Sequence, residues 1–117
     1  MKQVNDATGR ILKLLGLAVK AGRTVIGVPL ICTALSRGIK DKTPLLVLEA
    51  ADSSANTHKR ITDRTAFYGV RTIRLSVDCA TLAHAIGKKE AAVAAVGVTE
   101  PNLARAIMQI TQEEASS

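Results

Sequence analysis

The sequence predicts an α/β fold, with helices in two layers around a small four-stranded sheet. Nine segments of helical and strand pattern alternate strictly along the chain, which is typical of a three-layer α/β/α sandwich. Glycine, proline and serine stand at the boundaries between segments, and no internal repeat or long linker interrupts the order. A chain of 117 residues is long enough for one core. We therefore expect a single domain over residues 1–117, with frayed ends at residues 1–5 and 113–117.

The first helix is predicted from apolar residues that recur at helical spacing. Either Asp6 or Thr8 can cap its beginning, and Gly22 stands where a helix usually ends. Its apolar positions are Ile11, Leu14, Leu15, Ala18 and Val19.

The stretch VIGVPLICTALSRG, residues 25–38, predicts the end of a strand followed by a second helix. Residues 24–26 are β-branched and Gly27 interrupts them. Pro29 fits the first turn of a helix, where the amide has no partner within the helix. The helix is expected to end at Arg37, before a glycine.

The apolar run LLVLEA, residues 45–50, is bounded by turn signals and predicts a strand buried on both faces. A loop, AADSS, follows it. Ser53 or Ser54 can cap a third helix that ends at Gly69. Its inward residues are expected to be Ile61, Thr65, Ala66 and Tyr68, and its solvated residues His58, Lys59, Arg60, Asp63 and Arg64.

Four shorter elements complete the chain. TIRLSV, residues 72–77, predicts a strand, and Asp78 can cap a short helix over residues 79–87. AAVAAVGV, residues 91–98, predicts the last strand, and Thr99 with Pro101 opens the final helix.

The charge distribution predicts a polyanionic partner. The net charge is +6, and residues 1–99 carry 15 lysines and arginines against 7 acidic residues. For a small domain with a pI near 9.8, nucleic acid is the commonest polyanion, although a basic surface can also serve solubility alone. Aromatic residues make up only 2% of the chain, which argues against a platform that stacks single-stranded bases.

No targeting or redox pattern is visible. The chain opens without the apolar run of a signal peptide, and ILKLLGLAV is too short to span a bilayer, so we expect a cytoplasmic protein. Cys32 and Cys79 form no metal or redox motif, and we expect reduced, buried thiols.

Motifs for catalysis are lacking. His58 and His84 have no neighbour in the sequence that implies an orienting partner. AIGKKE contains a Gly-Lys pair, but it lacks the earlier glycine and the following serine or threonine of a nucleotide-binding loop. The carboxylates of Glu49, Asp52 and Asp63 are scattered. Cys79 beside Asp78 could form a thiol site, but a helix cap is the simpler role for the aspartate. The sequence thus predicts neither an enzyme nor a site for a cofactor or metal.

Small and basic residues gather at the predicted ends of elements, where α/β sheets place ligands. Glycine there lets the backbone approach a phosphate chain, and lysine or arginine would neutralise the phosphates. This rim comprises Lys20, Gly22 and Arg23; Gly27 and Arg37; residues 51–56, which include Ala51 and Asp52; and Gly87, Lys88 and Lys89.

Three stretches carry a resemblance to a known family. LLGLAVKAGRTVIG, SSANTHKRITDRTAFYGV and LAHAIGKKEAAVAAVGV together resemble the bacterial YlxQ-type branch of the L-seven-Ae ribosomal-protein superfamily, whose better-known members bind kink-turn RNA. The resemblance covers residues 10–110. It implies a mixed sheet and an RNA-binding edge built from the start of the second helix, the loop after the second strand and the loop before the last strand.

The resemblance also shows where this chain departs from the kink-turn binders. Pro29, Leu30 and Thr33 occupy the positions at which those proteins read base pairs, and Ala50, Ala51 and Asp52 stand in place of their Ala-Glu-Asp loop. Helical spacing places Leu30, Thr33 and Arg37 on one face of the helix and Ile31, Ala34 and Leu35 on another. Leu30 cannot make hydrogen bonds to base edges.

We therefore expect an RNA-binding protein that contacts structured RNA, ribosomal or otherwise non-coding, through phosphates and shape, with weakened base reading. Kink-turn specificity stays open. The expected contact residues are Lys20, Arg23, Gly27, Val28, Pro29, Leu30, Thr33, Arg37, Ala51, Asp52, Ile86, Gly87, Lys88, Lys89, Ala91 and Ala92. The alternative is a protein-interaction module, in which Val28, Pro29 and Leu30 form an exposed apolar patch for a protein partner or a second copy.

Overall fold

The computed structural model describes residues 6–88 and 91–116, and within them helices and strands alternate without exception. The elements are α1 (Asp6–Lys20), β1 (Thr24–Ile26), α2 (Val28–Arg37), β2 (Leu46–Glu49), α3 (Ala55–Tyr68), β3 (Arg71–Arg74), α4 (Cys79–Ala85), β4 (Ala95–Val98) and α5 (Pro101–Ser116). The predicted order of elements is confirmed. No helix among these residues is long and apolar enough to cross a membrane.

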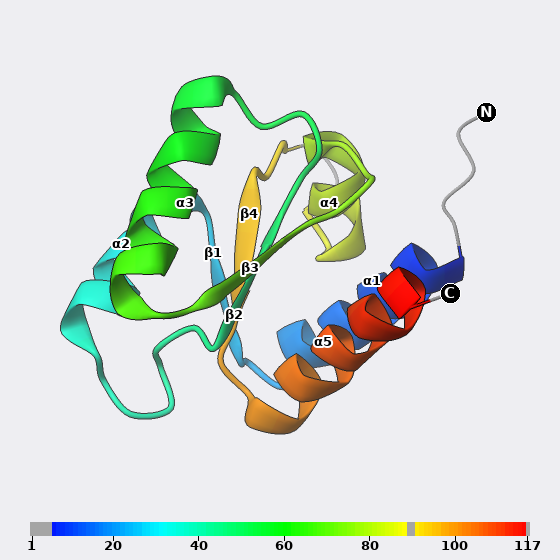
Figure 1. Cartoon of the computed structure of the whole chain (residues 1–117), viewed down its shortest axis with the longest axis horizontal. Helices are drawn as coiled ribbons and strands as arrows, with labels where there is room; N and C mark the ends of the chain where they lie inside the picture. The colour runs from blue at the N-terminus through cyan, green and yellow to red at the C-terminus, as the bar shows by residue number, and fades with distance from the viewer. Residues whose placement is uncertain (1–5, 89–90, 117) are drawn as a thin grey trace.

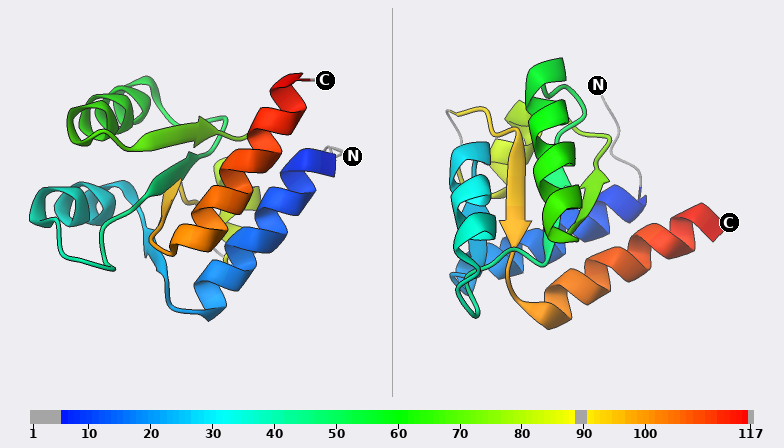
Figure 2. Two further views of the ribbon diagram at one scale, coloured as in Figure 1. Left: turned by 60° about the horizontal axis from the view of Figure 1, so that its bottom comes forward. Right: turned by 60° about the vertical axis from the view of Figure 1, so that its left-hand side comes forward.

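The four strands form one mixed sheet in the order β1-β4-β2-β3. β2 and β3 are parallel, whereas β4 runs antiparallel to both β1 and β2. Helices α2 and α3 cover one face, and α1, α4 and α5 cover the other (Figures 1 and 2). The predicted three-layer α/β/α sandwich is therefore confirmed, with β1 and β3 at its two edges.

The alternation of side chains along β2 divides the core between the two helical layers. Leu46 and Leu48 pack against residues of α1, α4 and α5, whereas Val47 packs against α2 and α3. All three are fully buried. Full burial of such a side chain stabilises the fold by about 1.5–3 kcal/mol, and this is why the strand is apolar on both faces.

Several predicted helix ends differ in detail. Ser54, rather than Ser53, caps α3, because its hydroxyl accepts a hydrogen bond from the Thr57 amide at 3.1 Å. Thr8 lies inside α1, half a turn beyond its first described residue, and its hydroxyl is 3.1 Å from that of Ser76. Residues 113–116, which the sequence predicts to be frayed, are helical.

Two further expectations are wrong. Glu100, not Thr99, caps α5: its carboxylate accepts the amide hydrogens of Leu103 and Asn102, which lower the pKa of Glu100. Ala66 and Tyr68 are exposed rather than inward, because the described part of α3 buries only the narrow stripe of Ile61 and Thr65.

The loop between α2 and β2 is anchored at the centre of the sheet. A Cβ atom added at Gly97 of β4 would lie 2.9 Å from the ring of Pro44, closer than carbon atoms normally approach. Glycine at residue 97 therefore lets Pro44 pack directly on the strand, and this contact positions the loop that leads into β2.

Candidate nucleic-acid interface

The antiparallel direction of β4 brings three of the predicted loops to one end of the sheet. The Gly27 amide donates to the Ala95 carbonyl at 3.0 Å, and the Ala50 amide donates to the Ala94 carbonyl at 2.8 Å. The loop after β1, the loop after β2 and the segment before β4 are thus neighbours. Gly27, residues 51–52 and residues 91–92 meet at this end of the sheet.

The turn from β1 into α2 depends on Gly27. Its φ of 95° lies in the region that residues with a side chain rarely adopt, and Pro29 follows in the first turn of α2. Ile31 and Leu35 then pack inward, while Leu30 is 60% exposed. The predicted division of the helix into two faces is observed with one exception. Thr33 and Arg37 are exposed on the side of Leu30, but Ala34, which was expected to face inward, is half-buried beside them.

Val28 does not belong to an exposed apolar patch. Its side chain is buried in the cluster between α2, α3 and the sheet, because the first turn of α2 directs it toward Ile31 and Val47. The apolar surface here consists of Pro29 and Leu30, both exposed.

A groove of about 550 Å³ runs between β1 and the exposed side of α2. We call it the β1 groove. Four of the predicted residues line it. Ile39 and Lys42 were among those missed, although an isoleucine followed by two lysines in a loop is an available sequence signal. Its lining residues are Thr24, Val25, Ile26, Leu30, Thr33, Ala34, Arg37, Ile39, Lys42 and Lys88.

The charged residues of the β1 groove are all cations. Arg37, Lys42 and Lys88 are exposed, and no acidic side chain among the described residues lines the groove. The ion pairs recorded within residues 6–88 and 91–116 lie elsewhere, on α3 and at the end of β2. These three cations are therefore available to an anion.

Lys20 and Arg23 lie at the opposite end of the sheet, where β1 begins. The Arg23 guanidinium donates to the Thr99 carbonyl at 2.9 Å and to the Thr99 hydroxyl at 3.2 Å. Its charge is thus tied to the end of β4. The structure does not bring this pair together with Gly27.

The loop after α4 is exposed only in part. Gly87 and Lys88 face solvent, whereas Ile86 is buried in the cluster of α1, α4 and α5. The sequence predicted an RNA contact by Ile86, but its buried side chain is not available for one. Lys89 lies outside the described residues. Ala91 and Ala92 are exposed.

Asp52 is engaged within the protein. Its carboxylate accepts the Cys79 amide hydrogen at 2.7 Å, and the hydrogen bond from the Cys79 thiol together with this amide lowers the pKa of Asp52. Burial, followed by the bond to Asp52, raises the pKa of Cys79 to about 11. The thiol is therefore neutral at pH 7, which argues against a reactive cysteine.

Asp78 caps α4 as predicted, since it accepts the Thr81 amide hydrogen at 2.7 Å.

A buried polar cluster at the end of β2 was missed. Glu49 is fully buried, Ser53 donates its hydroxyl hydrogen to this carboxylate, and His58 Nδ1 lies 2.9 Å from both carboxylate oxygens. The side chain of His58 is 44% exposed, so its predicted contact with solvent holds in part, but its pairing with Glu49 was not predicted. The pair forms because the first turn of α3 folds back over the end of β2. A carboxylate that ends a buried strand needs such partners, and that was the available signal.

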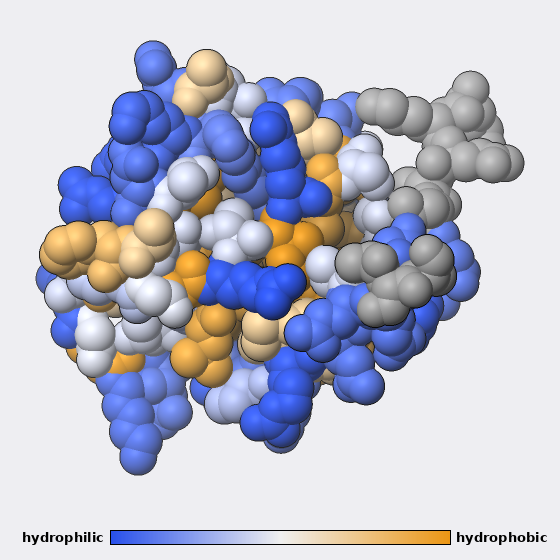
Figure 3. Space-filling view, in the orientation of Figure 1, coloured by the Kyte–Doolittle hydropathy of each residue, from blue (hydrophilic) through white to orange (hydrophobic). Residues whose placement is uncertain are grey.

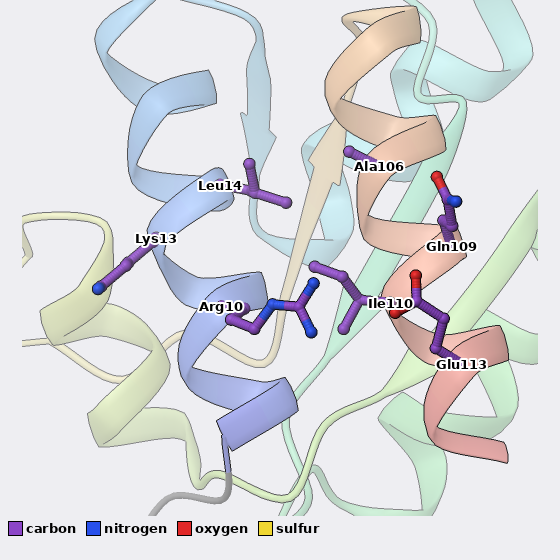
Figure 4. A pocket seen from close by; sticks show the side chains of 7 residues that line it. All are labelled: Arg10, Lys13, Leu14, Ala106, Gln109, Ile110 and Glu113. Atoms are coloured by element: carbon purple, nitrogen blue, oxygen red, sulfur yellow. The ribbon is translucent and has the colours of Figure 1, made fainter. Parts of the chain in front are cut away.

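A hollow between two other helices is less suited to an anion. This hollow, of about 410 Å³ between α1 and α5, contains both charge signs, since Arg10 and Glu113 reach into it while Lys13 points away (Figure 4). It lies on the opposite face of the sheet from α2. Figure 3 shows the side on which β3 lies in front, where hydrophobic side chains appear between hydrophilic ones without a continuous apolar groove.

Comparisons with known proteins identify the fold. No protein-family model and no curated protein matches the sequence. The structure is similar to that of a protein of unknown function from Bacillus halodurans, with a TM-score of 0.75 and 25% identity over 86% of this chain and 94% of that one. It is also similar to the Giardia lamblia 15.5kD RNA binding protein, with a TM-score of 0.75 and 14% identity over 95% of this chain and 89% of that one.

Proposed function

We propose that this protein binds structured RNA through phosphate contacts and shape, and that it is not an enzyme. The main support is that Arg37, Lys42 and Lys88 line one groove, which runs along β1 as far as the glycine turn at its end, and that its described lining residues include no acid. The shared fold with an RNA-binding protein from Giardia lamblia agrees with this proposal.

The proposed interface combines cations with a closely approachable backbone. Gly27 and the exposed Gly87 present main chain without side chains, and Ala51, Ala91 and Ala92 add little bulk. Phosphates need only charge and reach, whereas base edges need hydrogen-bonding side chains. The exposed Leu30 offers none, so we propose weak base reading without kink-turn specificity.

The motif resemblance extends the proposal to a biological setting. Membership of the YlxQ-type branch would imply a cytoplasmic partner of ribosomal or other non-coding RNA, with a role connected to translation. Crosslinking in cells, followed by sequencing of the bound RNA, would identify that partner.

The first test is a salt titration with two RNAs. Fluorescence anisotropy would measure Kd for a labelled kink-turn RNA and a straight duplex of equal length, at roughly 50 and 200 mM salt. Three or four phosphate contacts should weaken binding about 40- to 150-fold over this range, with the two RNAs differing by only a few fold. Absence of binding, or a Kd that ignores salt, would refute the proposal.

A charge-matched pair of variants locates the interface. Arg37→Glu with Lys88→Glu should weaken RNA binding at least tenfold, because each substitution replaces a phosphate contact with a repulsion. Arg60→Glu with Arg71→Glu makes the same change of net charge at exposed positions of α3 and β3, and should weaken binding only a few fold. Equal losses in both variants would mean that diffuse charge, rather than this surface, holds the RNA.

A further inference from the structure

The outer edge of β1 has backbone groups without partners. The Gly27 amide donates to Ala95 and the Arg23 carbonyl accepts from Thr99, so residues 23, 25 and 27 direct their hydrogen-bonding groups toward β4. In an antiparallel pair the intervening residues point the other way. Thr24 and Ile26 therefore direct their amide and carbonyl groups outward, where no described residue forms a backbone hydrogen bond with them.

This open edge borders the β1 groove along its whole length. All three residues of β1 line the groove and are only half-buried. Across from them, α2 and the following loop supply Leu30, which is 60% exposed, and Ile39, which is 46% exposed. Unpaired strand backbone beside exposed apolar side chains is the arrangement that accepts an added strand.

Cations stand at both ends of the groove. Helix α2 runs back along β1, so Arg37 and Lys42 lie at the end of the groove where β1 begins. Lys88 lies at the other end, because it precedes β4, and the start of β4 pairs with the end of β1. An acidic partner would meet opposite charge at each end. A second copy of this chain would instead place the same three cations against each other, which disfavours pairing of β1 with its own copy.

We propose that the β1 groove binds an extended peptide with apolar residues at its centre and acidic residues at both ends, which joins the sheet as a strand beside β1. The peptide backbone forms hydrogen bonds with the backbone of Thr24 and Ile26. Its apolar side chains contact Leu30 and Ile39. Its carboxylates form ion pairs with Arg37, Lys42 and Lys88. Because Arg37 and Lys88 also belong to the proposed RNA interface, peptide and RNA exclude each other.

The test uses a fluorescein-labelled octapeptide of four central valines with two glutamates at each end, titrated with the full chain at roughly 50 mM salt. A version with proline in place of the second and third valines cannot donate from those positions and should bind at least tenfold more weakly. A version with lysine in place of glutamate should also lose at least tenfold. Equal affinity for all three peptides, or no binding of the first, would overturn the proposal.

Protein variants separate the groove from general charge. Arg37→Glu with Lys42→Glu should weaken peptide binding at least tenfold, whereas Arg60→Glu with Arg71→Glu, an equal charge change on the other side, should change it less than threefold. Comparable losses in both pairs would overturn the assignment to this groove.

Amide hydrogen exchange identifies the mode of binding. Peptide should slow exchange at Thr24 and Ile26 at least tenfold, while Val25, already paired with β4, should change little. Protection of Thr24 and Ile26 that rises with protein concentration in the absence of peptide would show that a second copy occupies the edge. Binding of RNA but not peptide would overturn this inference alone, and binding of peptide but not RNA would overturn only the proposed function.

Discussion

The two edges of the sheet differ in whether the polar side chains beside them have partners within the protein. Beside β3, Arg74 donates to the Ala51 carbonyl at 2.8 Å, Thr72 donates to Thr65 at 2.9 Å, and the carboxylate of Glu49 is enclosed by partners. Beside β1, the strand has no charged residue, and the neighbouring cations of the groove have no partner among the described residues.

The difference suggests a division between stability and binding. Polar groups that satisfy each other stabilise the fold but have little capacity left for a ligand, whereas groups left in water can exchange water for a partner. The β3 edge also presents Arg71 and Arg74 on the strand itself, which discourages pairing with another strand. The proposed binding surfaces lie at the β1 edge, and we expect mutations at the two edges to have different consequences.

The largest effect should come from breaking the cluster beside β3. His58→Ala removes a partner of the buried Glu49 carboxylate and should lower the free energy of unfolding by about 1–3 kcal/mol. Urea unfolding followed by circular dichroism measures this change. RNA and peptide affinities of the folded protein should stay within a few fold.

A double variant serves as the control for that experiment. Glu49→Leu with His58→Leu removes both members of the pair and should recover most of the lost stability, because no buried charge is left without a partner. If the double variant is no more stable than His58→Ala, then packing rather than the ion pair explains the loss.

An intermediate effect is expected from acid. The folded pKa of Asp52 lies below its ordinary value of about 3.9, so the unfolded chain takes up a proton at this residue at higher pH than the folded chain does. Its contribution is present above about pH 4 and is lost as the pH falls through the folded pKa. Between pH 5 and pH 3, Asp52→Asn should therefore lose less stability than the unmodified protein.

Asp41→Asn is the matched control for acid unfolding. Asp41 is exposed in the loop after α2, and its φ of 67° suits asparagine as well as aspartate. This variant should follow the unmodified protein at both pH values. An identical response of Asp52→Asn and Asp41→Asn would argue against a stabilising role for the bond from Asp52 to Cys79.

The smallest effect should be seen at the β1 groove. Arg37→Ala and Lys42→Ala remove exposed side chains without recorded partners, so each should change the free energy of unfolding by less than about 0.5 kcal/mol. The same urea titration measures them. A loss comparable to that of His58→Ala would mean that these cations are structural, and the contrast between the edges would fail.

Local patterns were sufficient to predict the elements of this fold. Helical spacing and glycine boundaries identified α1 and α2, and a short apolar run bounded by turns identified β2, because these signals reside within a few neighbouring residues. The same spacing predicted that Leu30 faces outward while Ile31 is buried.

The site was less predictable because it depends on how strands pair. Arg23 and Gly27 are only four residues apart in the sequence, yet they lie at opposite ends of β1. Proximity in the sequence predicted one rim for both, because it does not take the direction of the strand into account. The partners of Glu49 could not be predicted because they reach its carboxylate only through the packing of α3 over the end of β2. The β1 groove likewise joins residues from β1, α2, the following loop and the segment after α4.

The central position of β4 has a consequence for biosynthesis. β4 is the last of the four strands to be made, yet it lies between β1 and β2. Until residues 95–98 have emerged from the ribosome, β2 can pair only with β3, and β1 has no partner strand in this sheet. Pairing of Thr24 with Val98 closes a long loop, which slows folding relative to local contacts. The groove beside β1 therefore cannot form before residues 95–98 have been made, and a ligand that needs this groove would not bind a shorter nascent chain.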